Sequence, residues 1–146
     1  MKTAISLLAA ITAFALPAAT QTADAAKTQV AVLTYFLGHW ECAGKFDASG
    51  KPIEAELGFE SILDSHFVLF RHDDKPPHKY HAWAEWGWDS DNKRFVATVQ
   101  DSFAGTTRLF YTSGWDGARL VWEGGAVGKD ADQQFVFERC RRSSFK

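Results

Sequence analysis

The sequence predicts an all-β protein: an antiparallel up-and-down closed barrel of about eight strands with a short N-terminal helical turn. From His39 onward, runs rich in Phe, Val, Trp, Tyr and Thr alternate in polarity and recur about every ten residues. Gly, Pro, Asn and Asp separate these runs, and every connection is too short for a crossover helix. Neighbouring strands therefore pair as hairpins, which excludes parallel α/β folds and leaves a barrel or a sandwich.

The N-terminus predicts an exported protein, because residues 1–25 have the pattern of a signal peptide. Lys2 supplies the positive charge, and Ala4–Leu16 is an apolar run shorter than the about 20 residues that cross a bilayer. Cleavage is expected after Ala25, with Ala18 or Ala19 as alternatives. A periplasmic or secreted location follows, and a retained N-terminal anchor is the other possibility.

Residues 26–146 are predicted to form a single β-barrel domain. Val30, Leu33 and Leu37 have helical spacing, and Gly38 ends that helical turn. The strands expected after it are, in order, His39–Asp47, Ile53–Leu63, His66–Asp73, Lys79–Asp89, Arg94–Asp101, Thr106–Trp115, Ala118–Glu123 and Gln133–Arg142.

Composition and charge restrict the partners. The net charge is −2 with both signs interspersed, so we expect no nucleic-acid partner. Charged residues such as Glu54, Glu56 and Glu85 interrupt any apolar lipid-facing belt, so we expect no stable membrane insertion. Aromatic residues make up 14% of the chain, enough to fill a core or to line a cavity.

The cysteines favour the barrel over the sandwich. Cys42 lies on the first expected strand and Cys140 on the last, and a disulfide is the preferred state in an exported protein. A disulfide requires the Cα atoms of the two cysteines to lie within about 7 Å. A bond between Cys42 and Cys140 would therefore hold the first and last strands together, at the seam where a barrel closes.

Particular segments also carry a resemblance. They are the opening Gly38-His39-Trp40 and a middle stretch made of Gly87-Trp88-Asp89, Lys93–Thr98, Asp101-Ser102, Gly105-Thr106 and Gly114–Gly117. Together they resemble a bacterial family of secreted lipocalin-like proteins with a domain of unknown function, and more distantly nitrobindin-like and lipocalin barrels. The resemblance covers about residues 33–123 and implies a barrel with an internal cavity and no assigned activity.

The nitrobindin-like resemblance would imply haem held by a proximal histidine near the C-terminus. No histidine follows His81, so His66 or His72 would have to substitute. Haem binding is therefore a lesser alternative, and no cofactor is expected.

The strand at residues 79–89 indicates the interior. One face carries Tyr80, Ala82, Ala84, Trp86 and Trp88, whose small alanines leave room between large rings. Arg108 is a candidate anchor for a carboxylate or phosphate if it points inward, and an exposed outward Arg108 is the alternative. The predicted ligand-binding residues are Tyr80, Trp86, Trp88, Phe95, Arg108 and Phe110.

Other polar groups predict no chemistry. The metal-capable side chains His72, Asp73, Asp74, His78 and His81 lack the tight spacing of a zinc site and are expected in a solvated loop. No nucleophile lies in a recognisable catalytic context, so the chain is not expected to be an enzyme.

The function predicted is that of an exported carrier or sensor for a small hydrophobic or amphipathic ligand. The alternative is a filled barrel that acts as a structural or protein-interaction module, for instance through its basic C-terminal end. The oligomeric state is left open.

Overall fold

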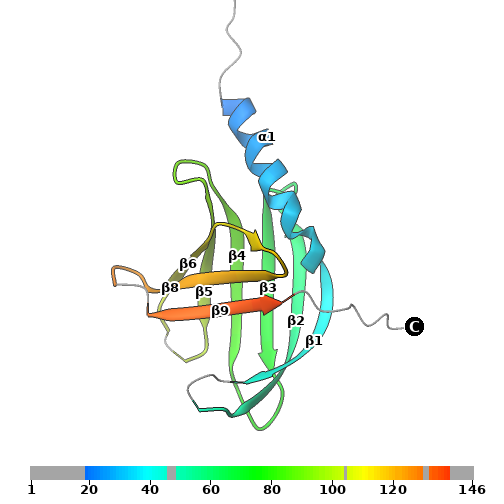
Figure 1. The fold of residues 1–146 in the computed structure, drawn as a ribbon, viewed down its shortest axis with the longest axis vertical. Coiled ribbons are helices and arrows are strands. Elements are labelled where there is room, and N and C mark those ends of the chain that lie inside the picture. The colour runs from blue at the N-terminus through cyan, green and yellow to red at the C-terminus, as the bar shows by residue number, and fades with distance from the viewer. Residues whose placement is uncertain (1–18, 46–48, 104, 130–131, 139–146) are drawn as a thin grey trace, which may run out of the picture.

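The computed structural model describes residues 19–45, 49–103, 105–129 and 132–138 (Figure 1). Nine strands form a single antiparallel sheet in the order β1-β2-β3-β4-β5-β6-β8-β7, and β9 pairs with β8. The elements are α1 (Ala19–Val30), the 3₁₀ helix η1 (Ala31–Phe36), β1 (Gly38–Lys45), β2 (Pro52–Ile62), β3 (Phe67–Asp74), β4 (His81–Asp89), β5 (Arg94–Asp101), β6 (Arg108–Thr112), β7 (Trp115–Asp116), β8 (Arg119–Ala126) and β9 (Gln133–Glu138). The all-β hairpin prediction is confirmed.

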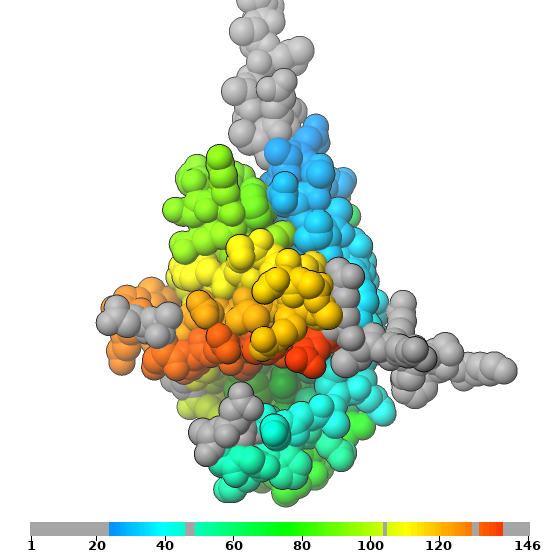
Figure 2. Space-filling view, in the orientation of Figure 1, coloured from blue at the N-terminus to red at the C-terminus, as the bar shows by residue number. Residues whose placement is uncertain are grey.

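The prediction of a closed barrel is wrong: the sheet curls into an open half-barrel. Within the described residues β1 pairs only with β2, and β9 pairs only with β8. Figures 1 and 2 show β8 and β9 crossing the front of the molecule, with α1 above them and the β1–β2 hairpin below. The ring of Phe137 on β9 packs against Phe36 of η1, Phe70 of β3 and Trp86 of β4. Large rings and the inserted helical segment fill the space across which β1 and β9 would have to approach.

The helical segment is longer than predicted and closes one end of the half-barrel. A short turn within 28–37 was expected, whereas α1 and η1 together run from Ala19 to Phe36 and include the predicted cleavage region. Leu33 and Phe36 are buried, and the Trp40 indole N–H donates to the Phe36 carbonyl oxygen. Trp40 therefore packs against the helical segment at this end. No helix within the described residues is long and apolar enough to span a membrane.

One predicted strand is divided. The run Thr106–Trp115 becomes β6 and β7, because the chain turns at Gly114, whose φ of 108° suits glycine. The Thr112 hydroxyl accepts a hydrogen bond from the Gly114 N–H at 3.2 Å and holds this turn. The sequence therefore predicted one strand of ten residues where the structure has two shorter strands.

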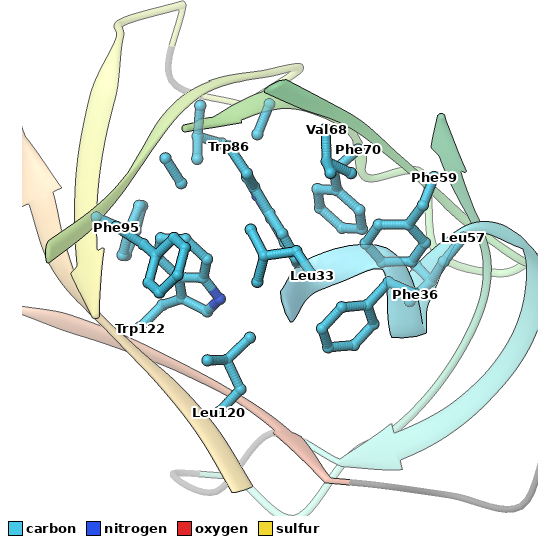
Figure 3. Packing of buried hydrophobic residues seen from close by; sticks show 14 of the residues in the cluster. Leu33, Phe36, Leu57, Phe59, Val68, Phe70, Trp86, Phe95, Leu120 and Trp122 are labelled. Atoms are coloured by element: carbon cyan, nitrogen blue, oxygen red, sulfur yellow. The ribbon is translucent and has the colours of Figure 1, made fainter. Parts of the chain in front are cut away.

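Aromatic rings fill the middle of the half-barrel (Figure 3). Trp86 and Trp122 are each 2% exposed, and their ring centroids lie 4.9 Å apart. Phe59 packs against Phe70 at 4.9 Å and against Phe36 at 5.1 Å. Such edge and offset contacts each add about 0.5–1.5 kcal/mol beyond burial, so this network stabilises the fold.

The two ends of the half-barrel differ. The helical segment covers one end. At the other end lie the β1–β2, β3–β4, β5–β6 and β8–β9 connections, because antiparallel pairing brings the finish of each first strand beside the start of the next. We call this second end the mouth.

Candidate ligand-binding site

Polar side chains gather on the inner face at the mouth. Along β3 the buried positions Val68 and Phe70 predict that His72 and Asp74 also point inward. Along β5 the same alternation from Phe95 places Asp101 inward, and along β6 it places Arg108 inward with Phe110. The mouth cluster consists of His72, Asp74, Tyr80, Asp101, Arg108 and Gln133.

A buried ion pair forms the centre of the mouth cluster. Arg108 Nη1 lies 2.8 Å from Asp101 Oδ2, and the two side chains are 15% and 0% exposed. The Phe103 N–H donates to the other Asp101 oxygen at 2.9 Å, and Arg108 Nη1 also donates to Gln133 Oε1 at 3.4 Å. Strands β5, β6 and β9 are thus joined through polar contacts that face the interior.

A second polar pair lies on β3. His72 Nε2 is 2.7 Å from Asp74 Oδ1, and the Asp74 side chain is 4% exposed. The His72 ring meets the Tyr80 ring edge-on at 5.2 Å and the Phe70 ring at 6.1 Å. His72 therefore stands between the polar mouth and the aromatic core.

Tyr80 faces the charged groups of both pairs. Burial raises the pKa of its phenol above 10.0, the negative charge of Asp101 raises it further, Arg108 opposes this, and Asp74 adds to the rise. The phenol stays protonated at neutral pH and can donate a hydrogen bond. The 5.2 Å contact between the rings of Tyr80 and His72 places Tyr80 beside the polar pair on β3.

The structure brings only two of the six predicted ligand-binding residues together at the mouth, Tyr80 and Arg108. Trp86, Phe95 and Phe110 lie in the core at 2%, 3% and 1% exposure. Trp88 is half-buried and packs against Phe95. The predicted inner face of the strand at 79–89 is correct, but Trp86 and Trp88 on it pack against rings of other elements.

The expected solvated loop at residues 72–81 is partly wrong. His72 and Asp74 belong to β3 and face inward, whereas Asp73 and His81 pair across the outer face at 2.7 Å. His78 lies in the connection, 3.1 Å from the Pro52 carbonyl oxygen. The potential metal ligands are therefore divided between two faces of the sheet.

Sequence reasoning missed Asp101, Gln133 and the inward pair on β3 as site residues. The signal for Asp101 was present, because Phe95, Ala97 and Val99 alternate toward it. Asp101 was not assigned to the site because an aspartate at a strand end usually marks a turn.

The outer face also carries a shallow hollow. It has a volume of about 410 Å³ over β1, β2 and β3 and is lined by His39, Trp40, Glu41, Glu56, Leu57, Gly58, Arg71 and Asp73. Lys75 lies 3.2 Å from Glu41 and 3.7 Å from Glu56, and its hydrogen bond to Glu41 raises its pKa above 10.5. These exposed charges compensate one another and form a solvated surface.

The two cysteines of the predicted disulfide cannot be compared in the structure. Cys42 is exposed on β1, and Cys140 lies outside the described residues. The bond stays a prediction, as does the signal peptide, whose residues 1–18 also lie outside the described ranges.

Comparison with known proteins identifies no family: no protein-family model matches the chain, and no curated protein matches its sequence. The lipocalin-like resemblance therefore stays a prediction.

Proposed function

We propose that this protein binds a small amphipathic molecule at the mouth of the half-barrel, without catalysing its conversion. The observation that carries the proposal is the Asp101–Arg108 ion pair, which is buried and faces the interior. Figure 2 shows a recess between β9 and the β1–β2 hairpin, on the side away from α1.

Stability alone gives no reason for this ion pair. Burying two charges costs several kcal/mol per ion before their attraction repays it, and apolar residues of similar volume often serve a fold equally well. An ion pair that is retained on an inner face although stability does not require it is a candidate for ligand recognition. The mouth cluster supplies acceptors on its carboxylates, donors on Arg108 and Tyr80, and an imidazole on His72.

Apolar side chains surround the same end. Phe103 in the β5–β6 connection is 72% exposed, and its ring lies 5.4 Å from that of Tyr80. Val127 in the β8–β9 connection is 59% exposed, and its N–H donates to the Thr107 carbonyl oxygen at 3.3 Å. A polar interior with an apolar rim suits a ligand whose polar end enters first and whose apolar end rests on the rim.

The proposed setting is the periplasm or the extracellular space, where the protein would carry or sense its ligand. The predicted signal peptide at residues 1–25 supports this location.

A second candidate function is that of a filled structural or protein-interaction module. The aromatic network favours it, because Phe36, Trp86 and Phe137 occupy the middle of the half-barrel in direct ring contact. Such a protein would take up no small ligand.

The experiment compares two phenylalanine substitutions on adjacent residues of β4. Ala82 points inward and pairs with His72 and Asp101, whereas His81 points outward. Ala82→Phe should fill the mouth and abolish the fluorescence increase of the neutral apolar probe N-phenyl-1-naphthylamine, and His81→Phe should leave it unchanged. If the wild-type protein binds neither this probe nor octanol, the filled-barrel candidate is favoured.

A further inference from the structure

The charges at the mouth determine which polar group the site accepts. Two carboxylates, Asp74 and Asp101, face the interior with side chains 4% and 0% exposed, against one guanidinium, Arg108. Arg108 is already engaged by Asp101 and Gln133, so it is poorly placed to anchor a ligand carboxylate. An anionic ligand would also have to approach both buried carboxylates.

Asp74 is the charged group at the mouth that can still accept a hydrogen bond from a ligand. Its Oδ1 contacts His72 at 2.7 Å, and its backbone N–H donates to the Tyr80 carbonyl oxygen at 2.9 Å. Its Oδ2 has no hydrogen-bond partner among the described residues, although the side chain is 4% exposed. Asp74 Oδ2 therefore keeps only a small contact with solvent, and a ligand that enters the mouth can donate a hydrogen bond to it.

The aromatic rings at the mouth suit the same kind of ligand. Tyr80 and Phe103 place their rings 5.4 Å apart, tilted by 54°. The faces of such rings carry negative electrostatic potential and attract ammonium groups. Because the pKa of the Tyr80 phenol is raised by burial and by Asp101, the ring remains a neutral phenol and adds a donor rather than a third negative charge.

Resting on the proposed function, we infer that the mouth is selective for an amphipathic amine, whose ammonium group bonds to Asp74 beside Tyr80 and whose apolar part lies against Phe103 and the rim. The amine is bound unchanged, by charge-assisted hydrogen bonds and contact with the rings. The anion anchor considered for Arg108 is replaced by a cation anchor on β3.

The chain offers a matched control for the test. Asp73 and Asp74 are neighbours on β3, but the Asp73 side chain is 62% exposed on the outer face, where it pairs with His81. Asp74→Asn and Asp73→Asn therefore remove the same charge from the two sides of one strand. Circular dichroism and thermal melting would establish that both variants are folded.

The experiment measures the binding of octylammonium, octanoate and octanol to the full chain by calorimetry at neutral pH. Octylammonium should bind about tenfold or more tightly than octanoate, as expected for one buried charge-assisted hydrogen bond. Asp74→Asn should remove this preference, and Asp73→Asn should preserve it.

The outcomes separate the inference from the proposed function. If octanoate binds as tightly as octylammonium, or if Asp74→Asn keeps the preference, the inference is overturned while ligand binding stands. If octanol and N-phenyl-1-naphthylamine also fail to bind, the proposed function falls with it.

Discussion

Replacing Arg108 with methionine tests whether the ion pair at the mouth serves binding rather than stability. The substitution keeps an unbranched side chain but leaves Asp101, whose side chain is 0% exposed, without its guanidinium partner. At 2.8 Å and an effective dielectric constant near 20, the two charges attract by about 6 kcal/mol, most of which offsets the desolvation of both. Removing one partner from such a pair costs about 3–5 kcal/mol.

The double variant Asp101→Leu/Arg108→Met should recover most of that loss. It removes both charges at once and places apolar groups where Val99 and Phe110 already line the inner face. We expect its free energy of unfolding to lie within about 1 kcal/mol of wild type. Its affinity for octylammonium should fall, because the site loses its charge pattern.

Urea unfolding followed by tryptophan fluorescence measures the free energy of unfolding of each variant. The comparison holds if the dependence of this free energy on urea concentration is the same in all variants. Together with the second single variant, Asp101→Leu, these variants form a thermodynamic cycle that isolates the coupling energy between Asp101 and Arg108. A cost below about 1 kcal/mol for Arg108→Met would contradict the burial argument. A double variant as unstable as the single one would show instead that the pair maintains the fold.

Three further predictions follow from particular contacts. The midpoint of Tyr80 ionisation should lie above pH 10.0 in the folded protein, which an absorbance titration compared with Tyr80→Phe would detect. Because the folded pKa is raised, the associated stability is complete below the unfolded pKa and is lost as the pH rises through the folded pKa. Gly124→Ala should destabilise the protein by about 2 kcal/mol or more, since its Cβ would lie 1.9 Å from the Leu109 carbonyl oxygen, whereas Gly44→Ala meets nothing within 4 Å and should change melting little. Cys42 and Cys140 should resist alkylation until reduced in protein from an oxidising compartment, and the mass increase of two alkyl groups before reduction would exclude the disulfide.

The local structure could be predicted from the sequence because it depends on local chemistry. Alternation along β4 placed Ala84 and Trp86 inward and Glu85 outward, as the structure confirms. Turn residues such as Gly117, whose φ is 57°, separated the strands. Each of these features depends on neighbours within a few residues.

Closure could not be predicted in the same way. Whether β1 meets β9 depends on how much space the side chains of distant elements fill, and Phe36 and Phe137 meet although about a hundred residues separate them. Alternation shows which way a ring points, but it does not show whether the facing strand leaves a cavity. Trp86 was therefore predicted as ligand lining, whereas it lies in a packed core.

The candidate site depends both on local strand alternation and on packing between distant elements. The middle of each inward face is apolar and fills the core, so the ends of the strands are the positions where an inward polar side chain can remain within reach of solvent. Asp74 and Asp101 occupy such final positions on β3 and β5, and Arg108 occupies the first position of β6. A polar residue that keeps the alternation at a strand end is usually interpreted as a turn residue, but in a curled sheet it points into the mouth. Asp73 and Asp74 differ by one position and occupy opposite faces, so binding that depends on one and not on the other would show that strand alternation, rather than local charge, creates the site.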